Sequence, residues 1–226
     1  MTPVCRTQAL SLFAATIILG ATLCVAQPPD VHKVADAVDK HYNSLGSLET
    51  PFEESYRGGG MARVESGTMW LKKPGKMRWE YTSPTQKLFV TDGKQVWFYV
   101  PGEKQARRMA LRDLDDLRSP LRYLLGHTKL EKEFIGLSLA PDQKPATAGN
   151  TMLRGIPKSM QDRMSYVLIE ITPQFNIARI YIEELDGSAT EFRFTQQKEN
   201  VVLNDKRFRF TPPAGVEVME AKELQP

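Results

Sequence analysis

Apolar and polar residues alternate most regularly between residues 64 and 101 of this chain. Turn signals divide the stretch at Pro74-Gly75, at residues 82–84 and at Asp92-Gly93, where an Asp-Gly pair between apolar runs favours a hairpin. Between these turns every second side chain is apolar, and the face that these side chains share carries Met69, Leu71, Met77, Trp79 and Tyr81. Period-two alternation is typical of strands that bury one face. The stretch therefore predicts four consecutive antiparallel strands that form one side of a curved sheet.

The apolar spacing changes to three and four residues in two other segments. Residues 30–45 carry an apolar stripe between a possible N-cap, Asp30, and a stop signal, Gly46, and we expect a helix there that covers part of the sheet. In residues 111–125, Pro120 follows Ser119, a natural N-cap, and predicts two short helices instead of one. The apolar positions of this second segment are Leu111, Leu114, Leu117, Leu121, Leu124 and Leu125. These helices form either a lid or a surface layer that fills one end of a barrel.

The remaining pattern is dominated by strands. Strands are predicted at residues 52–56, 105–110, 129–139, 151–156, 166–172, 177–185, 190–198 and 206–211. Asp186-Gly187 predicts a second tight hairpin, and the polar residues 141–150 predict an exposed loop. The chain is therefore expected to be mainly β with a few helices.

The first 26 residues resemble a secretory signal peptide. Arg6 precedes a continuous run of apolar and small residues, and the run ends in Cys24-Val25-Ala26. We expect cleavage after Ala26, which leaves residues 27–226 as one domain. A membrane anchor and a lipidated Cys24 are the alternatives, although Leu23 is an unfavourable neighbour for lipidation. Both cysteines lie in this segment, so the mature chain carries no thiol chemistry.

Charge and side-chain chemistry exclude several functional classes. Arg6 is one of the 30 basic residues, so 29 remain in the mature chain against 27 acidic ones, a balance that does not favour nucleic-acid binding. The three histidines are far apart, and no nucleophile motif or metal-ligand spacing accompanies them. An acidic run at Asp113, Asp115 and Asp116 is better explained as an exposed helix start than as a metal site. We therefore expect no enzyme activity, no cofactor and no metal.

Methionine and tryptophan are frequent on the face that we expect to point inward. Methionine is unbranched and polarisable, so it suits a cavity that adapts to variable apolar guests. A barrel filled by its own side chains is the alternative. The residues assigned to this cavity are Met69, Leu71, Met77, Trp79, Tyr81, Met109 and Met152.

Three segments resemble the periplasmic outer-membrane lipoprotein carrier family (LolA). They are GTMWLKKPGKMRW at residues 67–79, DGKQVWFYVP at 92–101 and FRFTPPAGV at 208–216. The resemblance spans the mature chain in order and spacing. It implies an incomplete, unclosed antiparallel β-barrel whose open side is covered by a helical lid over an apolar cavity. The lid residues would be Leu114, Leu117, Leu121, Leu124 and Leu125.

Lys73 alternates with Met69 and Leu71, so its cation is expected to point into an apolar interior. A buried lysine needs hydrogen-bond partners or loses its charge. The resemblance implies that this position, an arginine in the family, latches the helical lid; lysine offers fewer and more flexible donors. Carbonyls at helix ends in residues 111–125 are the partners that we expect. The alternative is that Lys73 reaches solvent past Pro74.

The resemblance also implies a function. The protein would be a monomeric periplasmic chaperone that receives acylated lipoproteins from an inner-membrane ABC transporter and passes them to an outer-membrane acceptor. Three alternatives remain open at this stage. The chain could be such an acceptor, anchored through Cys24; a carrier of another apolar lipid or glycolipid; or a sensor domain that uses the fold for protein contacts.

Overall fold

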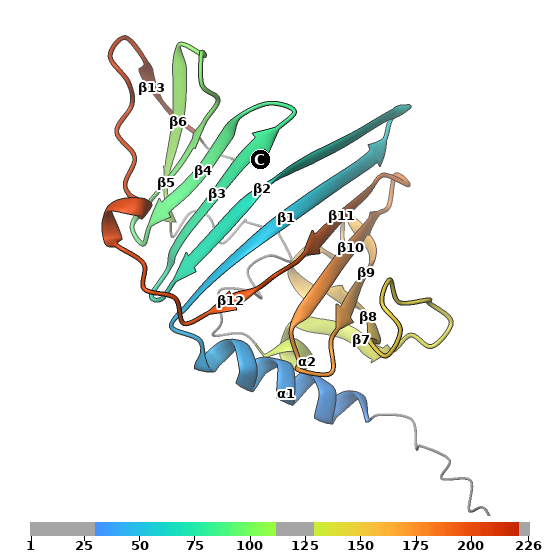
Figure 1. Cartoon of the computed structure of the whole chain (residues 1–226). Helices are drawn as coiled ribbons and strands as arrows, with labels where there is room; N and C mark the ends of the chain where they lie inside the picture. Colours follow the sequence, from blue (N-terminus) through green and yellow to red (C-terminus); the bar gives the residue numbers. More distant parts are fainter. Residues whose placement is uncertain (1–29, 112–128, 222–226) are drawn as a thin grey trace, which may run out of the picture.

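The computed structural model describes residues 30–111 and 129–221 of the chain (Figure 1). Within these ranges the fold is one curved sheet with a helix at one end. The expected signal peptide, residues 1–26, and nearly all of the helical segment at residues 111–125 lie outside the described residues.

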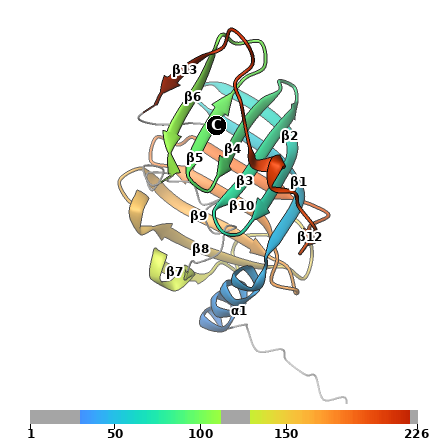
Figure 2. The same ribbon diagram turned by 90° about the vertical axis from the view of Figure 1, so that its left-hand side faces the viewer.

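Thirteen strands belong to the sheet. They are β1 (Ser47–Gly58), β2 (Met61–Lys72), β3 (Lys76–Ser83), β4 (Lys87–Asp92), β5 (Gln95–Tyr99), β6 (Gln105–Ala110), β7 (Phe134–Leu139), β8 (Thr151–Pro157), β9 (Met164–Ile171), β10 (Ile177–Glu184), β11 (Ala189–Phe194), β12 (Lys198–Glu199) and β13 (Glu217–Glu220). Their order is β13-β6-β5-β4-β3-β2-β1-β11-β10-β9-β8-β7, and β12 pairs with β1 off this path. Every pairing is antiparallel except that of β13 with β6. The two end strands, β13 and β7, do not pair, so the sheet is unclosed, as the resemblance implies (Figures 1 and 2).

The turn chemistry explains the predicted meander. Asp92 accepts hydrogen bonds from the backbone N–H groups of Lys94 (2.8 Å) and Gln95 (2.9 Å), while Gly93 adopts φ 95°. This conformation favours glycine and closes the β4–β5 hairpin. The four strands predicted between residues 64 and 101 are confirmed as β2 to β5.

Helix α1 (Val31–Ser44) begins at its predicted N-cap. The Asp30 carboxylate accepts from His32 N–H at 2.9 Å, and the helix ends at Leu45, one residue before the predicted stop. Its buried residues are Val34, Ala35, Val38 and Tyr42. They pack into the same cluster as the inner face of the sheet, so α1 closes one end of the concave side (Figure 1).

The predicted strand at residues 206–211 is wrong. The chain forms a short 3-10 helix, η4 (Asp205–Phe208), which starts at Asn204 where that side chain accepts from Lys206 N–H at 2.9 Å. The following aromatic, Phe210, packs on Trp97 and Tyr99 with ring centroids 5.4 and 5.3 Å away. The strands beneath already have sheet partners on both sides, so this segment lies across the convex face and contacts it through side chains.

Other predicted boundaries need correction. A one-turn helix, α2 (Leu130–Glu133), precedes β7 where a continuous strand was expected. The Asp39 carboxylate of α1 accepts from Leu130 N–H at 3.1 and 3.2 Å, which fixes this turn against α1. The predicted strand at 190–198 ends at Phe194, the first strand runs from Ser47 rather than residue 52, and β13 was not expected.

Candidate functional site

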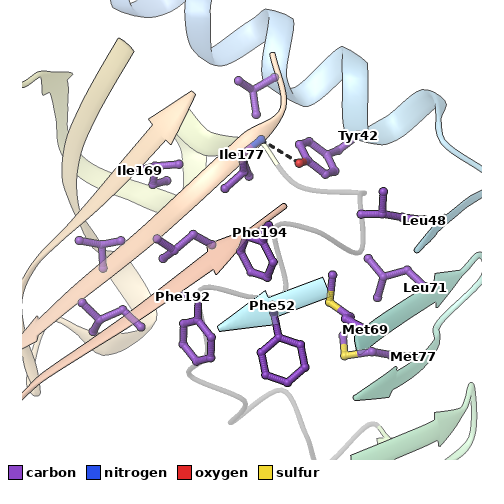
Figure 3. Close-up of a cluster of buried hydrophobic side chains, with 14 of the residues drawn as sticks. Tyr42, Leu48, Phe52, Met69, Leu71, Met77, Ile169, Ile177, Phe192 and Phe194 are labelled. Atoms are coloured by element: carbon purple, nitrogen blue, oxygen red, sulfur yellow. Dashed lines mark hydrogen bonds between the residues drawn. The ribbon is translucent and has the colours of Figure 1, made fainter. Parts of the chain in front are cut away.

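The concave face of the sheet is one continuous apolar cluster. Six of the seven expected cavity residues belong to it: Met69, Leu71, Met77, Trp79, Tyr81 and Met109. Each is at most 5% exposed. Strands on both sides of the β1–β11 pairing contribute, because Phe192 and Phe194 of β11 lie beside Phe52 and the β2–β3 residues in Figure 3. The alternation seen in the sequence thus places these side chains on a shared inner surface.

Aromatic rings join the two halves of this face. Phe52 lies 4.6 Å from Trp79 and 4.9 Å from Tyr81, measured between ring centroids. Trp79 then contacts Phe192 at 5.8 Å and Phe194 at 6.2 Å across the interior. Tilted and edge-to-face rings at these distances attract one another weakly, and they add to the backbone ladder by which β1 and β11 already join the two halves. Flexible methionines beside the rings allow the face to repack around a guest.

Met152 is the expected cavity residue that the structure places elsewhere. It lies in a separate small cluster with Ala140 and Leu168, and its Sδ is 3.7 Å from Arg179 Nη2. Successive side chains of a strand point to opposite faces of the sheet. Because the neighbouring Leu153 points into the concave cluster, Met152 lies on the convex face. Assigning Met152 to the cavity is therefore wrong.

Lys73 is bonded to the end of α1. Its Nζ donates to the backbone carbonyls of Tyr42 (2.6 Å) and Asn43 (3.0 Å), which belong to the last turn of the helix. Carbonyls in the last turn have no partner within a helix, so a cation is well placed there. Burial lowers the pKa of this amine from its usual value. The helix whose carbonyls Lys73 meets is therefore α1. The expected lid residues Leu114, Leu117, Leu121, Leu124 and Leu125 lie outside the described part of the chain.

Tyr42 ties α1 to the other half of the sheet. Its hydroxyl accepts from Ile177 N–H at 2.9 Å, the bond drawn in Figure 3. Burial raises the pKa of this phenol, which stays neutral. Sequence analysis had placed Tyr42 only on an apolar helix stripe, and no signal in the sequence indicates its distant partner.

Two buried glutamates complete the concave face and were missed by sequence analysis. Glu54 and Glu65 are 4% and 7% exposed, and they lie directly opposite one another on β1 and β2. Their positions in the alternation could have revealed them, because Glu54 is two residues after Phe52 and Glu65 four residues before Met69.

Other chemistry is sparse in the described ranges. Residues 30–111 and 129–221 contain no group of three or more His, Cys, Asp or Glu side chains arranged to hold a metal ion. Nor do they include a helix with the length and hydrophobicity needed to cross a bilayer.

Comparison with known proteins links this geometry to one family. The sequence profile of "Outer membrane lipoprotein carrier protein LolA" matches residues 47–211, from the start of β1 to the convex-face segment. A relative from Methylococcus capsulatus, named outer-membrane lipoprotein carrier protein, is 32% identical over 72% of this chain and 76% of its own length. A relative of the same name from Chromobacterium violaceum is 29% identical over 92% and 95%. An uncharacterized conserved protein from Thermus thermophilus shares the fold, with a TM-score of 0.53 at 12% identity over 84% of this chain and 98% of that one.

Proposed function

The chain belongs to the LolA family of outer membrane lipoprotein carrier proteins, and from this premise we propose that it is a periplasmic carrier that shields lipoprotein acyl chains on its concave face. The observation that carries the proposal is the apolar cluster shared by both halves of an unclosed sheet, with α1 held over one end by Lys73. Because its two end strands do not pair, the sheet can widen to admit acyl chains over its concave face.

Physical chemistry explains why such a carrier is needed. Each methylene buried in a membrane contributes about 0.8 kcal/mol, so a protein with several acyl chains leaves the membrane too slowly to cross water alone. A carrier must offer comparable apolar cover and still release its cargo. The contacts that the empty protein makes with itself reduce its net affinity, because cargo has to displace them first. The aromatic contacts of the concave face, together with the hydrogen bonds of Lys73 and Tyr42 that hold α1 in place, are the self-contacts that this role requires.

The proposal includes the partners and the compartment. An inner-membrane ABC transporter would supply the lipoprotein and an outer-membrane acceptor would remove it, while residues 1–26 direct export and are then cleaved. The carrier acts as a monomer and performs no chemistry on its cargo. Intact-mass measurement tests this part: cleavage after Ala26 is expected, and a diacylglyceryl group on Cys24 would make the protein an acceptor instead.

Acyl binding is tested by titrating the purified protein with a fluorescent fatty acid. Met77→Asp should weaken binding at least about tenfold, because an ionised carboxylate on the concave face must be desolvated by the chain. Thr68→Asp is the matched control, since Thr68 lies on the neighbouring strand with its side chain on the opposite face. Equal binding by a folded Met77→Asp protein and the wild type would place the site elsewhere. Mass spectrometry of copurifying acylated molecules then separates lipoprotein from other lipid cargo.

A further inference from the structure

The concave face changes from apolar to charged about 20 Å along β1 from α1, given the usual rise per strand residue. Glu54 and Glu65 face each other there across adjacent strands. Like charges directly opposite one another destabilise a sheet, and buried carboxylates cost free energy unless they are paired. Such an arrangement needs compensation by neighbouring side chains, by water or by a ligand.

Compensation is unequal between the two carboxylates. Glu65 accepts from Lys87 Nζ at 2.7 Å, and Arg63 Nε lies 3.3 Å away. Glu54 accepts from the Tyr81 hydroxyl at 2.6 Å through Oε2, whereas the nearest cation to its Oε1 is Arg63 Nη2 at 3.8 Å, beyond hydrogen-bond distance. A carboxylate can accept about four hydrogen bonds. Glu54 thus retains an acceptor oxygen with no close donor among the described residues.

The nearby cations already face these carboxylates. Lys87 bonds Glu65 and also lies 4.4 Å above the Tyr81 ring. Arg63, which is half exposed, lies 5.0 Å above the Tyr56 ring. A ligand that carried a carboxylate or phosphate would have to approach two carboxylates, with only the half-exposed Arg63 as a loosely held counter-charge. A ligand with an N–H donor would meet the unfilled oxygen of Glu54.

This charged cluster borders the apolar face directly. The Tyr81 ring that donates to Glu54 is also in edge contact with Phe52. Opposite Phe52 stands Gly67, where an added Cβ would lie 1.9 Å from Glu80 O, so the strands approach too closely here for any side chain. A hydrocarbon chain that lies over Phe52 and Tyr81 would therefore bring its polar end to Glu54.

We propose that Glu54, supported by Tyr81, is the subsite for the polar head of an acylated ligand, and that this head is an N–H donor, an ammonium or an amide. The inference rests on the proposed function, because the ligand's chains must first lie on the concave face. It adds the direction in which the ligand binds, with its head at Glu54 and its chain running towards α1.

The test compares lauryl amine, lauryl alcohol and laurate as competitors of a fluorescent fatty acid. The wild type should bind the amine about tenfold more tightly than the alcohol, the effect of one charge-assisted hydrogen bond, and should bind laurate no better than the alcohol. Glu54→Gln keeps an acceptor for Tyr81 and should remove the preference for the amine. Glu53→Gln is the matched control, because Glu53 is the exposed neighbour on the same strand and should change nothing.

The possible results distinguish a failure of the head-group subsite from a failure of the proposed function. If the alcohol displaces the probe but the wild type shows no amine preference, the head-group subsite is wrong and the acyl-binding face stands. If none of the three displaces the probe, the proposed function fails and the subsite with it. Should Glu54→Gln fold poorly, Arg63→Gln provides the second variant, since removing the cation nearest Glu54 should strengthen the amine preference; an unchanged preference would also overturn the proposal.

A last comparison identifies the source of the donor. Phosphatidylethanolamine and a diacylated lipopeptide with a free N-terminal amine carry the same ammonium on different scaffolds. Under the proposed function the lipopeptide should bind more tightly than the phospholipid, whose phosphate would lie near Glu65. The reverse order would indicate a membrane lipid as the ligand.

Discussion

The two faces of the sheet treat buried charge differently. On the convex face the Glu170 carboxylate, 1% exposed, accepts from Arg179 Nε (2.8 Å), from Asn150 Nδ2 (2.8 Å) and from the backbone N–H groups of Ala146 (2.9 Å) and Thr147 (3.1 Å). On the concave face Glu54 has one short hydrogen bond. A saturated carboxylate fixes a loop, whereas an unsaturated one retains capacity for a ligand. Under the proposed function, this difference in bond saturation separates Glu170, a structural group, from Glu54, a ligand-binding one.

The largest expected effect on stability comes from removing the fully hydrogen-bonded carboxylate of Glu170. Glu170→Ala would remove the acceptor of Arg179 Nε and of two loop amides in a buried site, although Arg179 keeps its ion pair with Glu191, and it should lower the free energy of unfolding by about 3 kcal/mol or more. Urea denaturation measures the change, and acyl-probe affinity should remain that of the wild type. A loss of probe binding in the folded variant would mean that the convex face contributes to the site.

The pH dependence of stability tests the role of Glu170 in a second way. Burial raises the pKa of Glu170, but hydrogen bonds from Ala146, Asn150 and Thr147 outweigh burial and hold the pKa below its usual value. The folded state therefore binds this proton less readily than the unfolded chain, so the contribution to stability is present above the unfolded pKa and is lost as pH falls through the folded one. Acid titration of wild type and Glu170→Ala should show a steeper loss in the wild type.

Substitution of Lys73 tests the contact between this residue and α1 at the other end of the concave face. Lys73→Leu removes two charge-assisted hydrogen bonds to α1, each worth about 1.5–3 kcal/mol where fully buried and less at this half-buried site. We expect the variant to load acyl cargo normally but to pass it to an acceptor more slowly, because closure no longer helps to expel the chains.

Lys73→Arg is the control for that experiment. Its forked donor can reach the same carbonyls, so transfer should be preserved. Normal transfer by Lys73→Leu, measured between purified carrier and acceptor, would contradict a role for this contact with α1 in release.

Asp39 should have a smaller effect on stability, with a pH dependence opposite in sign to that of Glu170. Burial raises its pKa to about 6, a shift that the hydrogen bond from Leu130 N–H opposes and neighbouring Asp36 reinforces. Between its ordinary pKa and 6 the folded state binds the proton more tightly, so this group's contribution falls as pH rises through that window. Because Asp39 is half exposed, we expect only about 1 kcal/mol, discounted for solvent screening. Asp39→Asn should remove that slope in thermal melts recorded from pH 4 to 7.

The smallest effect is expected at Met152. Met152→Leu conserves volume on the convex face and should cost less than about 1.5 kcal/mol with no change in acyl-probe affinity. A clear loss of affinity would return Met152 to the binding site and contradict its placement beside Leu168.

Local patterns predicted the sheet well because strand alternation and turn chemistry act over a few residues. Met69, Leu71, Met77, Trp79 and Tyr81 share the face that their spacing indicated. The prediction for Met152 was wrong because this residue was assigned to the wrong face of its strand. The strand predicted at 206–211 was wrong because alternating aromatic residues can serve side-chain packing as well as strand pairing.

The features of the site that depend on tertiary contacts could not be predicted. Lys73 meets Tyr42 across 31 positions, and Tyr42 meets Ile177 across 135. Nor does a single sequence indicate that Glu54 and Glu65 fall in register, because that depends on the length of the β1–β2 hairpin.

The pairing of β1 with β11 also determines when the concave face can form. Phe52 is in register with Phe194, so this seam joins segments about 140 residues apart, whereas the strands on either side of it are joined by short hairpins. Contacts between distant segments form slowly, since the chain entropy of closing the loop is lost before the contact forms. Each half can assemble first as a meander with its apolar side exposed. The surface that we propose to shelter acyl chains in the finished protein is therefore the one most exposed to aggregation while the chain folds.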